Sequence, residues 1–124
     1  MDNTAEEMRG KCSEITNVNG MTIVSGLHTI PCRPSKPFAS GYLGYFMNST
    51  AYHDQLMRLM QGTKVLSISK AALQDTNIYF PEKNEEQAKI ATFFQRLDSL
   101  ITLHQQELDK LKNIKKACLE KMFV

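Results

Sequence analysis

The chain has 124 residues, 42% of them hydrophobic, and a formal net charge of +2, which suits one compact domain plus one further long element. No apolar run approaches the roughly 18 residues of a membrane span, and the acidic, polar N-terminus lacks a signal peptide, so we expect a cytoplasmic protein without a membrane segment. The three cysteines are odd in number and widely spaced, which argues against a disulfide framework and fits a reducing cytoplasm.

The first third of the chain carries strand signals. Residues 15–18 and 21–24 flank Asn19-Gly20, the preferred dipeptide of a two-residue hairpin turn. A third apolar segment, residues 27–30, ends at a stretch with three prolines within residues 31–37. Because proline lacks the backbone N–H, this stretch is predicted to be an extended loop.

Short helices follow, interrupted by two further strands. Ser40 is predicted to cap a helix over residues 41–47, and Ser49 or Thr50 another over residues 51–60, which Gly62 ends. Residues 65–68 read as a strand, Ser69 caps a helical turn over residues 70–73, and residues 77–80 form a last strand. The fold class predicted is α+β: a small mixed domain over residues 1–80, followed by one long helix over residues 81–124.

The start of that helix is well marked. Asn84 with Gln87 three residues later fits a capping box, and Glu85 and Glu86 place negative charge where the helix dipole favours it. Neither glycine nor proline interrupts residues 85–123, so the rod would be about 55 Å long.

Along this helix, apolar residues recur in steps of four and three over about four heptads, the signature of a coiled coil. Ten positions form this stripe, hereafter the seam: Ile90, Phe94, Leu97, Ile101, His104, Leu108, Leu111, Lys115, Cys118 and Met122. Phe93, Leu100 and Ile114 lie one residue before seam positions and widen the stripe. We therefore predict that the seam pairs with a second helix; the alternative is a solitary helix packed along its own domain.

Positive charge gathers in the predicted body. Between residues 15 and 74 there are five Lys or Arg against one acid, which fits a nucleic-acid binder, although ordinary solvated surface is an equal alternative. The candidate DNA-binding residues are His28, Arg33 and Lys36 around the proline-rich loop, with Lys64 and Lys70 as further phosphate contacts.

No catalytic constellation is visible. The three histidines stand far apart, no Cys or His pair has the spacing of a zinc site, and the glycines fit no phosphate-binding loop. We predict no enzyme activity of this chain, no metal and no cofactor. His104 and Lys115 are interpreted as seam residues that specify assembly rather than as a base or ligand.

Four blocks of sequence resemble the C-terminal part of the specificity subunit of a type I restriction-modification system. Residues 85–124 are similar to the terminal helix of that family, with Glu86-Gln87, Leu97-Asp98, Lys115-Lys116 and Met122-Phe123 in matching places. Upstream, the segments QGTKVLSISKAALQDTNIYFP, FASGYLGYFMNSTAYHDQL and VSGLHTIPCRP resemble parts of a target-recognition domain. The resemblance extends from about residue 10 to the C-terminus.

The resemblance implies a non-catalytic subunit that binds double-stranded DNA. In this family, two recognition domains each read half of a split target, two long helices pair antiparallel as a spacer, and modification and restriction subunits dock on the assembly. This chain holds one helix and a partial recognition domain, so the resemblance implies a homodimer or pairing with another specificity subunit. Two alternatives stay open: a dimerisation or decoy partner that does not bind DNA, and an unrelated small enzyme with a helical tail.

Overall fold

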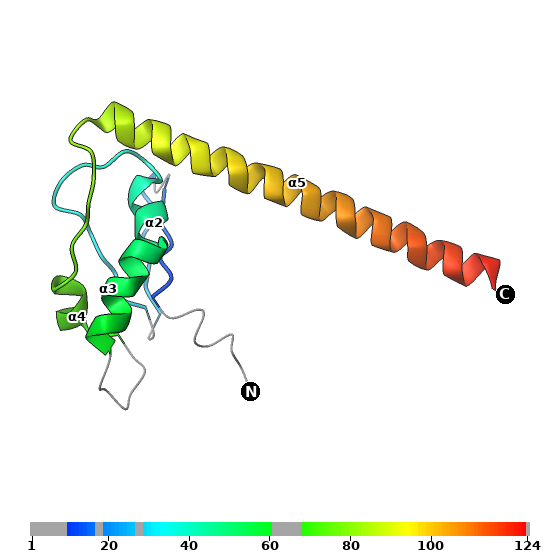
Figure 1. Ribbon diagram of the computed structural model, residues 1–124, viewed down its shortest axis with the longest axis horizontal. Helices are drawn as coiled ribbons and strands as arrows, with labels where there is room; N and C mark the ends of the chain where they lie inside the picture. The colour runs from blue at the N-terminus through cyan, green and yellow to red at the C-terminus, as the bar shows by residue number, and fades with distance from the viewer. Residues whose placement is uncertain (1–9, 17–18, 27–28, 61–67, 124) are drawn as a thin grey trace. The chain divides into compact units, whose positions relative to one another are not determined.

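The computed structural model of the chain describes residues 10–16, 19–26, 29–60 and 68–123. Its helices in chain order are α2 (Tyr42–Met47), α3 (Thr50–Met60), α4 (Lys70–Gln74) and α5 (Asn84–Met122), drawn in Figure 1. The chain divides into two compact units, unit 1 over Met1–Ala91 and unit 2 over Thr92–Val124. None of the helices described is both long enough and apolar enough to span a membrane.

Helix α2 begins at a glycine and is capped by a distant carboxylate. Gly41 has φ 89°, a left-handed conformation that glycine adopts without steric cost, and no side chain of its own caps the helix. Instead Glu14 accepts hydrogen bonds from the Gly41 amide (2.8 Å) and the Gly44 amide (3.0 Å). The predicted Ser40 cap is therefore wrong. A carboxylate at this position satisfies amides that the helix leaves unpaired and suits the helix dipole.

The caps predicted for the next two helices are confirmed. The Ser49 hydroxyl accepts from the Tyr52 amide (3.3 Å) at the start of α3, and the Ser69 hydroxyl accepts from the Ala72 amide (3.1 Å) at the start of α4. Helix α3 packs against both α2 and α4. The end predicted for α3 at Gly62 lies outside the described residues.

The core of unit 1 is small and largely aromatic. Its buried apolar residues are Tyr42, Tyr52, Leu56 and Ala91. Around them the rings of Phe46 and Tyr52 lie with their centroids 5.8 Å apart, and Phe38 meets Phe80 edge-on at 5.0 Å. Such ring pairs add to the free energy gained by burying their area.

The α+β fold class predicted from the sequence is wrong, because no strand occurs among the residues that the structure describes. In the expected hairpin, Asn19 and Gly20 do form a turn, with Gly20 at φ 71°, but Ile15, Met21 and Val24 are exposed rather than set against a core. A strand needs a neighbour to pair its backbone groups. The pattern of apolar residues predicts an extended backbone, but it does not show whether a second strand lies beside it. Residues 17–18, 27–28 and 65–67 of the expected strands lie outside the described residues.

In unit 1, side-chain amides form hydrogen bonds with backbone groups that a neighbouring strand would bind in a β-ladder. Asn48 donates to the Cys12 carbonyl (2.7 Å) and accepts from the Cys12 amide (2.8 Å). Gln55 does the same with the backbone of Asn77, at 3.0 and 2.8 Å. The side-chain amides of Asn48 and Gln55 each provide one donor and one acceptor. They therefore bind the backbone of an extended segment as a neighbouring strand would. We call these contacts the amide ties.

A third amide tie stands in the first turns of α5. Gln87, only 2% exposed, donates to the Pro81 carbonyl (2.8 Å) and accepts from the Ala39 amide (3.0 Å). The predicted capping box between Asn84 and Gln87 is therefore wrong, since the Gln87 side chain is engaged elsewhere. The Lys83 carbonyl accepts from the amides of Glu86 and Gln87 and opens the helix.

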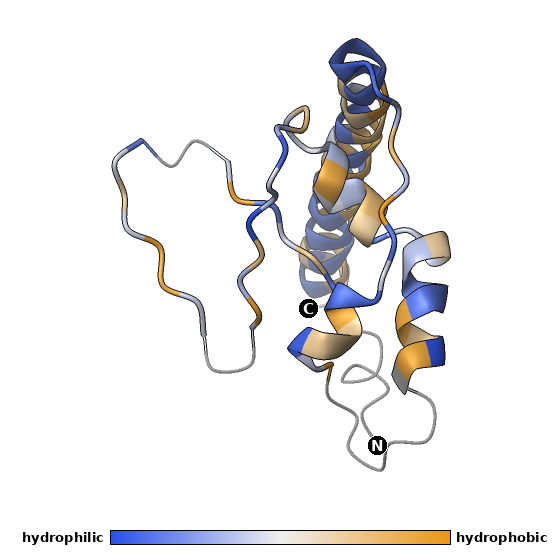
Figure 2. Ribbon diagram, turned by 90° about the vertical axis from the view of Figure 1, so that its left-hand side faces the viewer, coloured by the Kyte–Doolittle hydropathy of each residue, from blue (hydrophilic) through white to orange (hydrophobic). Residues whose placement is uncertain are grey.

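The long C-terminal helix predicted from the sequence is confirmed. Helix α5 runs without interruption over Asn84–Met122, 39 residues, which corresponds to about 58 Å. Its first turn carries Glu85 and Glu86 and its last turn carries Lys121, so the charges complement the helix dipole at both ends. Figure 2 shows apolar and polar stretches alternating along the ribbon of α5.

Candidate nucleic-acid and helix-pairing interfaces

The basic residues of unit 1 lie on exposed, irregular or terminal segments. Arg33 and Lys36 are exposed in the proline-rich stretch, three residues apart, on a segment without regular secondary structure. Lys70 is exposed at the first residue of α4. No ion pair involving these three cations occurs in the described part of unit 1.

The structure describes three of the five predicted DNA-binding residues, Arg33, Lys36 and Lys70. His28 and Lys64 lie outside the described residues, and Lys70 lies at the start of α4, on a different segment from Arg33 and Lys36. Arg33 and Lys36 share one short segment. The role of all five residues in DNA binding stays a prediction.

The seam of α5 is exposed along its length. None of its ten positions is buried, and Ile101, Leu108 and Leu111 are 54%, 51% and 63% exposed. Phe93, Leu100 and Ile114 beside the seam are also at least half exposed. Single exposed apolar residues are common on protein surfaces, whereas continuous apolar stripes are not. The pairing of the seam with a second helix stays a prediction.

The two polar residues of the seam differ in their surroundings. His104 Nδ1 lies 3.4 Å from the Glu107 carboxylate one turn later, and both side chains are largely exposed. An exposed pair of this kind contributes little to helix stability. Lys115 has no ion-pair partner in the described part of α5. Neither residue belongs to a cluster that suggests catalysis.

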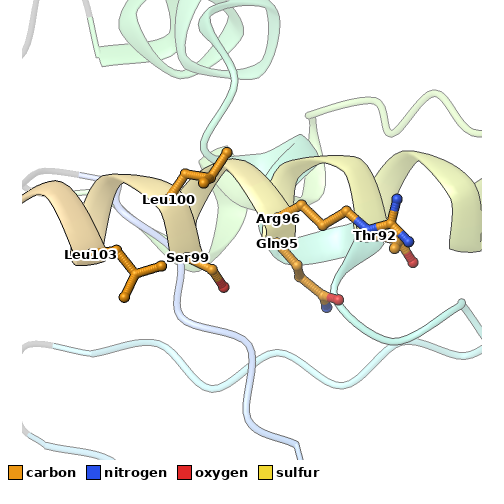
Figure 3. Close-up of a pocket in the computed structure, with 6 residues that line it drawn as sticks. All are labelled: Thr92, Gln95, Arg96, Ser99, Leu100 and Leu103. Carbon is orange, nitrogen blue, oxygen red and sulfur yellow. The ribbon is translucent and has the colours of Figure 1, made fainter.

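A hollow on α5 is lined by residues of that helix alone. Its lining residues, drawn in Figure 3, are Thr92, Gln95, Arg96, Ser99, Leu100 and Leu103. The spacing of three and four residues places them along one face, centred away from the seam. A hollow made by a single helix is an open groove, so it offers no enclosed environment for catalysis.

Two side chains of unit 1 have perturbed acidity for structural reasons. Burial raises the pKa of the Tyr42 hydroxyl, which donates to the Tyr79 carbonyl (2.8 Å). Burial also raises the pKa of the Cys12 thiol, with smaller contributions from Cys32 and Glu14. The described residues contain no group of three His, Cys, Asp or Glu side chains that could hold a metal ion.

Sequence reasoning missed Glu14, Asn48 and Gln55, which help to hold unit 1 together, and it assigned Gln87 a capping role in place of its contacts with Ala39 and Pro81. Each acts over a long sequence separation, and a polar residue on a helix gives no local signal of a distant backbone partner. The exposed ring of Tyr79 was likewise not singled out. Tyr79 comes two residues after Asn77, whose backbone is bound by Gln55. The spacing of residues in the sequence does not reveal that contact.

Comparison with known families identifies the chain. Residues 24–113 match the family model of the type I restriction modification DNA specificity domain. The match covers well over half of the chain and runs from unit 1 into α5, so the chain belongs to this family, and the resemblance seen in the sequence is confirmed. The DNA specificity domain is a recognition module and not a catalytic one. No significant match was found among curated proteins or among solved structures.

Proposed function

We propose that this chain is a non-catalytic DNA-specificity module of a type I restriction-modification system. In this proposal unit 1 contacts double-stranded DNA, and α5 pairs with the helix of a second specificity chain. The paired helices would then offer a docking surface to the modification and restriction subunits. The observation that carries the proposal is the family match, which continues from unit 1 into α5 without a break.

The charge of unit 1 supports contact with DNA. Arg33 and Lys36 are exposed and close together on a segment that is free of helix. Cations on such a segment can reach phosphates, which fix the position of a protein on the duplex, whereas side chains at base edges supply sequence specificity. His28 and Lys64 are further candidates for contact, and Lys70 offers a cation at the start of α4.

The exposure of the seam supports the pairing of α5. Six or more large apolar side chains lie on one stripe of the helix, each with about half of its surface open to water. Burying such a side chain stabilises an assembly by about 1 kcal/mol or more. A second helix with the same period would cover the whole stripe.

A binding assay tests the DNA contact. The double variant Arg33→Ala and Lys36→Ala should bind a mixture of random duplexes more weakly than the parent chain. Because each lost phosphate contact removes about 0.9 from the slope of log affinity against log salt, the slope should flatten by about 2. Mobility-shift titrations between low and moderate salt, with the modification subunit present, measure both quantities.

A matched control removes two cations elsewhere. Lys110→Ala with Lys116→Ala changes the net charge equally, but both residues lie on α5 outside the seam. This control should keep the steep salt dependence. Equal slopes for the parent and for the Arg33 and Lys36 variant would remove these two residues from the DNA interface.

A second candidate function is favoured by the size of the core of unit 1. Only Tyr42, Tyr52, Leu56 and Ala91 are buried apolar residues in the part of the chain that the structure describes. A body this small can support α5 without reading DNA, and the chain would then act as a dimerisation or decoy partner of longer specificity subunits. Such a partner would co-purify with a full-length specificity subunit and would shift no duplex at any salt concentration.

A further inference from the structure

The register in which α5 could pair with a second copy of itself is encoded by the two polar seam residues. In an antiparallel pair, each residue faces the partner residue whose number makes a constant sum with its own. The seam positions alternate between two classes, and each class faces the other across the interface. Sliding the pair by one heptad changes every facing residue, so each register makes a distinct set of layers.

In one register, the two polar seam residues, His104 and Lys115, face each other in both places where they occur. When His104 of one copy faces Lys115 of the other, Leu108 faces Leu111. The remaining layers in this register join Ile101 with Cys118 and Leu97 with Met122. The two polar residues therefore meet each other, and every apolar residue within the overlap meets an apolar residue.

The neighbouring registers leave polar groups against apolar ones. One heptad in one direction sets His104 against Leu108 and Lys115 against Leu97. One heptad in the other direction sets His104 against Met122 and Lys115 against Leu111. Placing an ammonium or an imidazole in an apolar layer without a partner is costly, so a single buried polar pair fixes register at small expense in stability.

The charges of α5 divide at the centre of the same register. Residues 97–109 contain three acids, Asp98, Glu107 and Asp109, and no Lys or Arg. Residues 110–122 contain five lysines and one Glu. The register that joins His104 with Lys115 lays each acidic half along the basic half of the other copy. A parallel pair would instead place acidic beside acidic and basic beside basic, and would set Lys115 against Lys115.

We propose that α5 pairs with a second copy of this chain, antiparallel and centred on the Asp109–Lys110 peptide, with each His104 facing Lys115 of the other copy. The inference rests on the helix pairing in the proposed function and adds its register. The Glu107 carboxylate, 3.4 Å from His104 Nδ1, lies within one turn of the layer that Lys115 enters. A neutral imidazole nitrogen and a carboxylate are both acceptors for an ammonium donor.

The register determines the distance along the paired helices between the points at which the two copies of unit 1 end. The two Ala91 residues, where unit 1 ends in each copy, would be about 55 Å apart along the helix axis. A slip of one heptad would change this separation by about 10 Å, which is the rise of about three base pairs. Pairing in one register therefore fixes the distance along the helix axis between the two Ala91 residues.

Cysteine cross-linking tests the register directly, because Cys118 already occupies a seam position. In a background of Cys12→Ser and Cys32→Ser, one further cysteine is introduced at Ile101, Leu108 or Phe94. Each variant reports one register by forming a disulfide with Cys118 of the other copy, since a disulfide requires Cα atoms within about 7 Å. Mild oxidation is followed by non-reducing electrophoresis and by mass-spectrometric mapping of the linked peptides.

The Ile101→Cys variant should form covalent dimer at least tenfold faster than the other two. Faster cross-linking of Leu108→Cys or Phe94→Cys would overturn the register, and a Cys118–Cys118 link in the background chain would overturn the antiparallel orientation. If the reduced chain sediments as a monomer at every concentration, the pairing of α5 with a second copy fails altogether, whereas pairing with a different specificity chain in the proposed function is not contradicted. A dimer that links through the wrong cysteine contradicts the register alone.

A double-mutant cycle gives a second measurement that needs no cysteine. His104→Leu and Lys115→Leu are made singly and together, and the dimer dissociation constants are measured by sedimentation equilibrium. Within one helix these residues are eleven positions apart, about 16 Å, too far for direct coupling. If they face each other between copies, the double variant should dimerise at least tenfold more tightly than the product of the single effects predicts. Additive effects would overturn the proposed layer.

Discussion

The two units of the chain bury their side chains to very different extents. In unit 1, Tyr52 and Leu56 are each 2% exposed, and the backbone of several extended segments is hydrogen-bonded by side chains of helices. In unit 2, every residue described from Thr92 to Phe123 is exposed. Unit 1 therefore gains its order from contacts within itself, whereas the helix of unit 2 carries apolar surface that a partner would bury.

Because of this difference, we expect different substitutions to affect the folding of unit 1 and the pairing of α5. Changes at the amide ties should weaken unit 1 and leave the pairing of α5 intact. Changes in the seam should separate paired chains and leave unit 1 folded. All four tyrosines of the chain lie in unit 1 and the chain has no tryptophan, so intrinsic fluorescence reports on unit 1 alone.

The largest effect is expected for a charge placed in the seam. Leu108→Asp would bury an unpaired carboxylate twice in a symmetric pair, which should weaken pairing by about 4 kcal/mol or more. Analytical ultracentrifugation should then find a monomer at concentrations where the parent chain is paired. Tyrosine fluorescence and its unfolding midpoint should not change, because Leu108 lies in unit 2.

Thr102→Asp provides the matched control. It introduces the same charge on the same exposed helix, but Thr102 is not a seam position. This variant should pair as the parent does. Equal dissociation of both variants would mean that the added charge, and not its place in the seam, weakens the pair.

A smaller effect is expected at the third amide tie. Gln87→Met keeps the length of the side chain but leaves the Ala39 amide and the Pro81 carbonyl without their partner. Leaving a buried polar group without its hydrogen-bond partner costs about 1–3 kcal/mol. Because the Ala39 amide and the Pro81 carbonyl are partly buried, the free energy of unfolding of unit 1 should fall by about 1 kcal/mol or more. Urea titration followed by tyrosine fluorescence measures it.

Gln95→Met makes the same chemical change at an exposed position of α5. It should alter the stability of unit 1 by less than about 0.5 kcal/mol. If the two variants unfold alike, the hydrogen bonds of Gln87 contribute nothing to unit 1, and its burial has another cause.

The helices were the predictable part of the fold, because their signals are local. Ser49 and Ser69 lie beside the amides that they cap, and the period of the seam is visible within a few turns of α5. The family was predictable for a similar reason: four continuous blocks carry the resemblance, and residues 24–113 match the family model.

The strands were not predictable, because a strand is defined by its neighbour. Residues 21–24 have the composition of a strand, yet they are exposed and are not paired in the structure. The contacts that hold extended chain in unit 1 come from Asn48 and Gln55, at sequence separations of 36 and 22 residues. No periodicity in the sequence links such distant partners.

The candidate DNA-binding residues were predictable only as exposed cations. Arg33 and Lys36 are exposed as a loop position implies, and nothing in their spacing indicates which base or phosphate either one would contact. The assignment of base contacts depends on how unit 1 docks on a duplex, which is a property of two molecules. The pairing of α5 also depends on two molecules. The period of its apolar residues, its two polar seam residues and its acidic and basic halves all lie on one helix, however, so the sequence restricts the possible partner more closely.

The smallest effect expected concerns the thiols of unit 1. Cys12 is half-buried, with its sulfur 3.8 Å from that of Met47, and burial raises its pKa. Since the thiolate is the reactive form, Cys12 should react with a disulfide reagent several-fold more slowly than exposed Cys32 at pH 7.5. The Cys12 rate should also keep rising at alkaline pH, after a thiol of ordinary pKa has become fully ionised. Asn48→Ala releases the Cys12 backbone and should bring the Cys12 rate toward that of Cys32, and equal rates in the parent chain would show that the first amide tie does not protect the thiol.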